Sequence, residues 1–379
     1  MKQDLGTSGG VASKTVEWAG LVLLCLVVGS VVSWHFFTWH GNHMEELHRY
    51  QRDLLDGHPS WVATQNRILG PYLIDWLMHV RGKDYAFSYN YFMHVSFILI
   101  SFSVVALCKA YRLDNIATVF IVLSASGIEL LMFNYWWFPW SNLEFSLLCL
   151  TFVSLTIEVR AIRIAVVGSL FAIMCLNKET AVFFPFWLIM SELARYYFTR
   201  SEQPSAVVKR ISVYILMILT SLTLTSYIRR ELWVSSYKPE RRSGVLDDAP
   251  QFLGNNIEIL GGAAWERGID TIKGLYAMLT LQNPVPLFGN KYWGDWSQPQ
   301  IFFYACFVVS FFASVKTFLN KDAENFAIAF TCFAYALVIA VLSNPVEVDK
   351  MMGFFAFGLL FFVKRVQNQG FSSPTGATT

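Results

Sequence analysis

The stretch GSLFAIMCLNKETAVFFPFWLIM, residues 168–190, places four polar residues between two apolar runs. A basic cluster at 160–163 precedes the first run, and another at 195–210 follows the second. Basic residues gather at the cytoplasmic ends of membrane spans, so the chain must cross twice between these clusters. One helix over 161–194 would also be about 50 Å long, too long for a single span. The sequence therefore predicts a helical hairpin with an external tip at 177–180.

The rest of the chain has the same apolar character. Of its 379 residues, 55% are hydrophobic and only 15% are charged, and the mean hydropathy is +0.43. This composition is unlike that of a soluble protein and indicates a polytopic membrane protein. Helices that could cross about 30 Å of hydrocarbon are predicted at these ten runs: 18–37, 86–108, 115–133, 143–158, 161–176, 180–194, 211–228, 301–319, 326–343 and 351–363.

Lysine and arginine at the span ends indicate which side each loop occupies. The positive-inside rule places in the cytoplasm Lys2 and Lys14, Lys109 and Arg112, Arg160 and Arg163, the 195–210 group, Lys316 and Lys321, and Lys364 and Arg365. Both termini are then cytoplasmic. We predict an all-α bundle of about ten transmembrane helices with a cytoplasmic N-terminus (1–17), one transmembrane domain (18–363), long external loops (38–85 and 229–300) and a cytoplasmic tail (364–379).

The first external loop holds two predicted amphipathic helices that lie at the membrane surface. In the first, at 45–55, Glu46, Arg49, Tyr50 and Asp53 share one face at helical spacing. The second begins near Gly70 and Pro71, with Arg67 just before it. A guanidinium beside the free N–H groups of a helix start makes a phosphate site, although an arginine here also serves to reach lipid headgroups.

The turn NYWWFPWSNLE, residues 134–144, is also expected on the external side. Trp136 and Trp137 either stack on a sugar ring or belong to the aromatic belt at the headgroups. Glu144 at its end joins Glu46, Arg67, Lys178 and Glu179 among the polar residues predicted on the external face. Ionisable residues at this depth are costly unless they face a cavity or a partner, so we expect this group to lie together round a groove.

Metal and cofactor signals are weak. His35, His40, His43 and His48 fall close together, but they lack the HExxH pattern, and a belt of interfacial histidines explains them more simply than zinc. The sequence indicates no cofactor, and a divalent metal stays open without a motif to support it. No nucleotide-binding or hydrolase motif is present, the six cysteines show no paired spacing, and the net charge of +2 gives no indication of nucleic acid binding.

Mainly over residues 15–190, the chain resembles the GT-C fold glycosyltransferases. The similarity lies in one span followed by a long external loop with an acid four residues before a tyrosine (Glu46, Tyr50). It continues in LLDGHPSW…NRILGPYLIDWL, 54–77, in the N-K-E hairpin tip at 177–179 and, weakly, in VEVDK at 346–350. Glutamate stands where that family more often has aspartate.

The resemblance implies an inverting transfer of a sugar from a polyprenyl-phosphate donor to a glycan or lipid acceptor on the outer, periplasmic face of a bacterial inner membrane, in cell-envelope polysaccharide biosynthesis. Glu46, or its neighbour Glu45, would take the proton of the acceptor hydroxyl. Arg49, Arg67 and Lys178 would bind the donor phosphate. Tyr50, Trp136, Trp137, Glu144 and Glu179 would contact the substrates.

Three other functions stay open. A Wzy-type polysaccharide polymerase or O-antigen ligase would fit the large late loop at 229–300 and its arginines. A transporter or flippase of lipid-linked glycans is a different class; it is disfavoured because Glu129 is the one charged residue deep in a predicted span and no internal repeat is visible. A non-enzymatic scaffold would lack an external groove between the first loop and the 177–179 turn.

Overall fold

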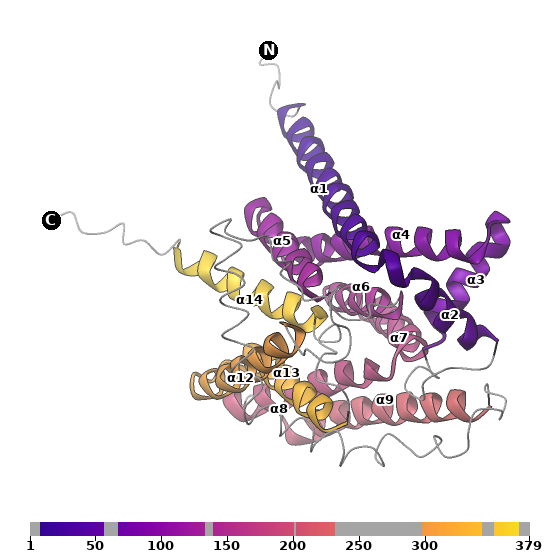
Figure 1. Ribbon diagram of the computed structural model, residues 1–379. Helices are drawn as coiled ribbons and strands as arrows, with labels where there is room; N and C mark the ends of the chain where they lie inside the picture. The colour runs from indigo at the N-terminus through magenta and orange to yellow at the C-terminus, as the bar shows by residue number, and fades with distance from the viewer. Residues whose placement is uncertain are drawn as a thin grey trace.

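The computed structural model describes residues 8–56, 67–132, 139–200, 202–231, 298–342 and 352–370. Over these ranges the chain is helical, without a β-strand (Figure 1). In chain order the elements are α1 (Ser8–His40), η1 (Gly41–His43), α2 (Met44–Leu55), α3 (Leu69–Arg81), α4 (Tyr85–Ala110), α5 (Asn115–Met132), α6 (Pro139–Ser154), α7 (Arg160–Asn177), η3 (Glu179–Val182), α8 (Phe183–Thr199), α9 (Pro204–Glu231), α12 (Gln298–Leu319), α13 (Ala323–Leu342) and α14 (Met352–Gly370).

Each predicted apolar run coincides with one of these helices, and the two predicted amphipathic helices are α2 and α3. Four helices are long and apolar enough to cross a membrane: Thr15–Thr38, Tyr85–Ala110, Arg160–Asn177 and Pro204–Thr225. Four further apolar helices are shorter. In the most exposed span, Pro204–Thr225, only 11% of the apolar window is buried. Several such apolar helices indicate a membrane protein, because an exposed apolar face of this length is stable in lipid and not in water.

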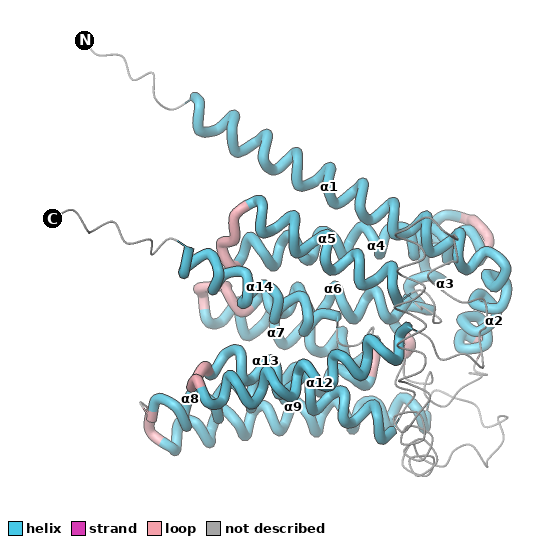
Figure 2. The backbone as a smooth tube through the Cα atoms, turned by 60° about the vertical axis from the view of Figure 1, so that its left-hand side comes forward, coloured by secondary structure: helices cyan, strands magenta, loops and turns pink. Residues whose placement is uncertain are grey.

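The helices run up and down through the bundle. Figure 2 shows the start of α1, the end of α14 and the short turns after α4, α6, α8 and α12 at one end, and α2 and α3 at the other. The turns at the first end carry the basic clusters that the sequence places in the cytoplasm. The basic clusters predict that successive spans run in opposite directions, and the helices that carry these clusters do so.

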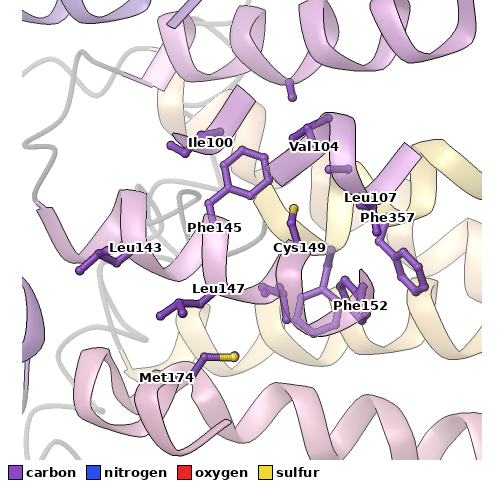
Figure 3. Close-up of a cluster of buried hydrophobic side chains, with 14 of the residues drawn as sticks. Ile100, Val104, Leu107, Leu143, Phe145, Leu147, Cys149, Phe152, Met174 and Phe357 are labelled. Atoms are coloured by element: carbon purple, nitrogen blue, oxygen red, sulfur yellow. The ribbon is translucent and has the colours of Figure 1, made fainter. Parts of the chain in front are cut away.

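Helix α6 lies at the centre of the bundle. Almost every residue of α6 is buried, and the helix packs against α3, α4, α7 and α14. Its inner half contributes Phe145, Leu147, Cys149 and Phe152 to the hydrophobic core, where Phe152 stacks on Phe357 of α14 with ring centroids 3.8 Å apart (Figure 3). A helix that is apolar round its whole circumference is expected in such a buried position.

Helices α1 and α4 approach each other closely at Gly29. A Cβ atom at this position would lie 2.6 Å from the Cα of Ile98. Small residues allow such backbone contact between membrane helices. Gly29→Ala is therefore expected to destabilise the protein by about 1–3 kcal/mol, measured as thermal unfolding in detergent.

Gly20, nine residues earlier on α1, is the matched control because nothing lies within 4 Å of its added Cβ. There alanine should be neutral or slightly stabilising, since it favours the helix by about 1 kcal/mol over glycine. Equal unfolding temperatures for the two variants would contradict this account of the α1–α4 contact.

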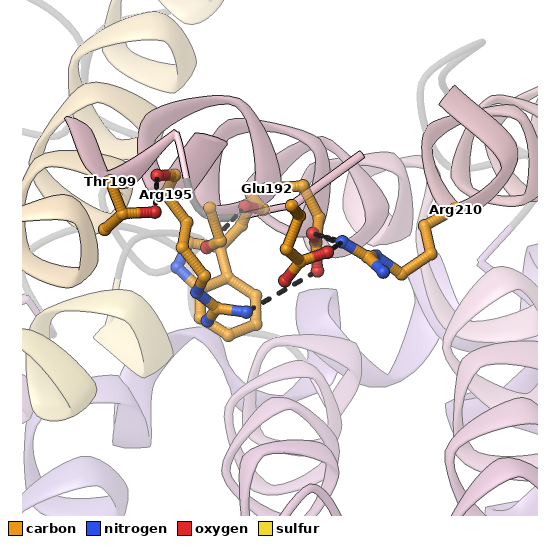
Figure 4. A network of polar contacts seen from close by, with 7 residues as sticks. Glu192, Arg195, Thr199 and Arg210 are labelled. Atoms are coloured by element: carbon orange, nitrogen blue, oxygen red, sulfur yellow. Dashed lines mark hydrogen bonds and ion pairs between the residues drawn. The ribbon is translucent and has the colours of Figure 1, made fainter. Parts of the chain in front are cut away.

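A group of ion pairs joins α8 to α9 at the end that the sequence places in the cytoplasm. Arg210 of α9 contacts Glu192 of α8 at 2.8 Å and also Glu202 in the connecting turn, and Arg195 lies 3.7 Å from Glu192 (Figure 4). The side chains of Arg195, Glu202 and Arg210 are each more than a third exposed, so each pair contributes little to stability. The network links the two helices across their connecting turn.

Candidate functional site

The turn between α7 and α8 is the centre of a buried charged group. Lys178 leaves the helix with an extended backbone, φ −162° and ψ 146°, and η3 then leads into α8. The side-chain amide of Asn177 donates to the carbonyl oxygen of Trp140 at 2.8 Å. This bond holds the turn against the start of α6. The predicted turn between two helices is thus confirmed, but it is packed inside the protein.

Lys178 is 1% exposed and pairs with Glu144 of α6, with 3.0 Å between Nζ and Oε2. The hydroxyl of Thr180 donates to the other oxygen of the same carboxylate. A buried ammonium and a buried carboxylate tolerate each other only with such close contact, because each alone would lose several kcal/mol of hydration. Lys178 and Glu144 therefore neutralise each other between α6 and the turn.

Arg67, two residues before α3, pairs with the next residue of the turn. Its Nη2 lies 2.8 Å from Oε1 of Glu179, and its Nε donates to Oε2 at 3.4 Å. The guanidinium also lies 5.4 Å from the centre of the Trp140 ring. This is the forked arrangement in which arginine binds carboxylates and phosphates. Arg67 is 5% exposed, whereas the side chain of Glu179 is 28% exposed.

The start of α3 reaches this place because Gly70 allows close packing. A Cβ at Gly70 would lie 3.1 Å from the Cβ of Pro139, the first residue of α6. Helix α3 also packs against α2, α4 and α7. Three distant segments, before α3, in α6 and after α7, thus meet at one end of the bundle. We call the group formed by Arg67, Trp140, Glu144, Lys178, Glu179 and Thr180 the charged cluster.

The prediction for Glu144 was wrong in one respect. The sequence places this residue in an external turn, but α6 begins at Pro139 and Glu144 lies buried in its second turn. In the sequence alone, Asn142 and Glu144 look like loop residues because their partners are distant in the chain. In the structure Asn142 donates to Ser96, and Glu144 binds Lys178. Trp136 and Trp137 lie outside the described residues.

Glu46 and Arg49 line a different feature, which we call the α2 hollow. It is an open depression of about 930 Å³ between α2, Asn42 and residues 84–86 at the start of α4. Glu46 and Arg49 form an ion pair of 3.6 Å, and Glu45 on the same wall is exposed. Asp53 also lines the hollow, which confirms the predicted shared face; the side chain of Tyr50 lies outside what the structure describes.

The sequence predicts that Glu46, Arg67, Glu144, Lys178 and Glu179 lie together round one groove, and the structure brings four of these five together. Arg67, Glu144, Lys178 and Glu179 come together, while the residues that line the α2 hollow include Glu45, Glu46 and Arg49 but none of those four. Helix α3 contacts α2 and α4 beside the hollow and α6 and α7 beside the charged cluster. Among the described residues, no three histidines, cysteines or carboxylates are placed to hold a metal ion.

His48 is a further residue in the wall of the α2 hollow. Burial lowers the pKa of His48 from its ordinary value, so its imidazole is neutral near pH 7 and has one donor and one acceptor nitrogen. His48 packs edge-on against Tyr89, with ring centroids 4.7 Å apart, and it lines the hollow with Tyr85.

Sequence reasoning missed several residues that complete these sites. Asn177 and Thr180 each lie next to a residue that was chosen, and Trp140 lies in the 134–144 stretch that supplied Trp136, Trp137 and Glu144, but nothing in the sequence shows which side chains of these stretches point inward. Asp84 and Tyr85 stood at the end of the first loop without a motif. Their signal was weak: Asp84 is an N-cap, because its carboxylate accepts from the backbone N–H of Phe87 at 2.7 Å.

No protein-family model, no curated protein and no solved structure matches the chain.

Proposed function

We propose that this protein is a membrane-embedded glycosyltransferase that moves a sugar from a polyprenyl-phosphate donor to an acceptor hydroxyl at the end of the bundle that carries α2 and α3. In this proposal the chain crosses the inner membrane of a bacterium about ten times, and both termini are cytoplasmic. The positive-inside rule then places the charged cluster and the α2 hollow on the external face.

The observation that carries the proposal is the forked binding of Glu179 by Arg67. A guanidinium that is almost fully buried, backed by an indole ring and paired with a partly exposed carboxylate, is suited to bind an oxyanion. A lipid-linked phosphate offers the same paired oxygens. Displacement of Glu179 by the donor phosphate would keep Arg67 charged and fully bonded.

The two cations of the cluster then differ in their roles. The Lys178–Glu144 pair is covered, with side-chain exposures of 2% and 8%, and a ligand that displaced Glu144 would leave that carboxylate buried without its cation. Lys178 therefore positions the turn. Arg67, whose partner is the more exposed Glu179, binds the phosphate.

The reaction would proceed as an inverting displacement. The acceptor oxygen forms a bond to the anomeric carbon, its proton passes to Glu46, and the bond from the anomeric carbon to the phosphate oxygen breaks. The lipid phosphate leaves with the extra negative charge, which Arg67 stabilises. Glu46 suits the base because its carboxylate is more than a third exposed in the hollow and is oriented by Arg49.

Transfer by the purified protein in detergent tests the proposal, with polyprenyl phosphates carrying radiolabelled glucose, mannose, galactose or N-acetylglucosamine as donors. Glu46→Gln should lower transfer by about 100-fold, because a missing general base commonly costs that much. Asp75→Asn, on α3 and not among the residues that line the hollow, is the matched control and should keep full activity.

Two results would contradict the proposal. If no donor in the set gives a transferred or hydrolysed sugar, the transferase function is wrong. If Glu46→Gln folds and transfers as fast as the natural protein, the base is another residue.

A further inference from the structure

Two exposed cations lie where α3 turns into α4. Gly82 ends α3 with φ 60°, a left-handed conformation that glycine adopts without strain, and the turn places Arg81 and Lys83 beside the first turns of α4. The guanidinium carbon of Arg81 lies 4.1 Å from the centre of the Tyr91 ring, and its Nη2 donates to the Tyr91 hydroxyl at 3.1 Å. Nζ of Lys83 lies 5.9 Å from the centre of the Phe87 ring. We call Arg81, Lys83, Phe87 and Tyr91 the cation platform.

The two rings of the platform hold the cations in place without neutralising them. Phe87 and Tyr91 are stacked, with ring centroids 6.3 Å apart and an interplanar angle of 11°. In the part of the chain that the structure describes, neither Arg81 nor Lys83 is paired with a carboxylate. The neighbouring acid, Asp84, accepts from the backbone N–H of Phe87 and lines the α2 hollow. A guanidinium has five N–H donors, so Arg81 keeps donors for an anion after its bond to Tyr91.

An exposed apolar face runs along α4 from the platform. Phe87, Tyr91, Val95 and Leu99 follow one another every four residues and so lie on one side of the helix. Phe87, Val95 and Leu99 are 44%, 42% and 40% exposed, and α4 is one of the helices long and apolar enough to cross a membrane. The rise from Phe87 to Leu99 is about 18 Å, close to the share of one leaflet in a hydrocarbon core of about 30 Å. A lipid whose chain lies along this face would reach the platform with its headgroup.

We propose that the cation platform and the α4 face below it bind one anionic phospholipid. Its phosphate contacts Arg81 and Lys83, and an acyl chain lies on Val95 and Leu99. Arginine binds two phosphate oxygens with paired N–H groups, and lysine adds a second positive charge. A zwitterionic lipid also has a phosphate, but the two cations repel its ammonium group, so the site selects a headgroup with a net negative charge. This inference does not rest on the proposed transferase function.

Thermal unfolding of the purified full chain in dodecyl maltoside tests the inference. A lipid that binds only the folded protein raises the unfolding temperature in a saturable way. Dioleoyl phosphatidylglycerol should do so at a lower concentration than dioleoyl phosphatidylcholine, which has the same chains. Arg81→Gln with Lys83→Gln should weaken phosphatidylglycerol binding by about 10- to 100-fold, the effect of losing charge-assisted hydrogen bonds.

Two further variants separate a built site from general attraction between charges. Tyr91→Leu keeps both cations but removes the ring and the hydroxyl that hold Arg81, so it should weaken binding about three- to tenfold. Arg160→Gln with Lys209→Gln removes one exposed arginine and one exposed lysine at the opposite end of the bundle, and it should bind as the natural protein does. Unfolding without added lipid shows that each variant is folded.

Four results would overturn the inference. The first is a folded Arg81→Gln, Lys83→Gln variant that binds phosphatidylglycerol as tightly as the natural protein, and the second is an equal loss of binding in the opposite-end variant. The third is equal competition by glycerol 3-phosphate, which has the phosphate but no acyl chain. The fourth is a loss of binding in Arg67→Ala and not in the platform variants, which would place the lipid at the charged cluster.

Discussion

Lys178→Met is expected to lower the free energy of unfolding by about 3–5 kcal/mol, the range found when one partner of a buried ion pair is removed. The cause is the carboxylate that remains. Glu144 is covered by α6 and the turn, and without Lys178 its Oε2 loses the cation 3.0 Å away. The hydroxyl of Thr180 still donates to Glu144, but one neutral donor does not replace an ammonium. Thermal unfolding in detergent measures the loss.

The double variant Lys178→Met with Glu144→Gln is the control. It removes both charges, and the amide keeps an acceptor for Thr180, so it should recover most of the lost stability. If the single variant loses less than about 1 kcal/mol, the pair is solvated and Lys178 does not hold the turn.

Arg67→Ala is expected to lower sugar transfer by about 100- to 1000-fold, as does the loss of a group that stabilises a developing oxyanion. The fold should survive this change better than the loss of Lys178, because Glu179 is 28% exposed and can be hydrated once Arg67 is gone. Activity with labelled polyprenyl-phosphate sugars and unfolding temperature, measured on the same samples, separate the two effects.

Two further variants sharpen this test. Glu179→Gln removes the anion that competes for Arg67, so polyprenyl phosphate should bind more tightly to this variant than to the natural protein. Arg163→Ala, at the opposite end of the bundle in α7, is the matched control and should leave transfer unchanged. Tighter lipid-phosphate binding by Arg67→Ala than by the natural protein would rule out Arg67 as the phosphate ligand.

Much of the fold could be read from the sequence because the relevant signals are local. Every apolar run became a helix, and the basic clusters at 160–163 and 195–210 required the turn between α7 and α8. The start of α6 was missed because Asn142 and Glu144 look like loop residues until Ser96 and Lys178 are beside them. A polar residue is tolerated in a buried helix only by a partner, and partners are distant in sequence.

The candidate site was predictable to a similar extent. Arg67, Lys178 and Glu179 could be selected from the sequence because they are charged and are predicted on the same side of the membrane. Charged residues at the end of an apolar bundle are costly unless they face a cavity or a partner. Their pairing was not predictable: adjacent residues of the turn bind different partners, Lys178 to α6 and Glu179 to the segment before α3. An extended Lys178 between two helical segments sends consecutive side chains in different directions.

The sequence by itself determined that the chain is an apolar, all-helical bundle with basic clusters at one end and the candidate site residues at the other, because hydropathy and basic clusters act within a segment. Only the tertiary structure decided that the 177–180 turn is buried, that Glu144 belongs to the core, and that Glu46 lines a hollow whose wall does not include Arg67. The physical reason is that burial and ion pairing depend on which helices pack together, and α3, α6 and the turn meet through Gly70, Asn177 and Trp140, contacts between segments far apart in the chain.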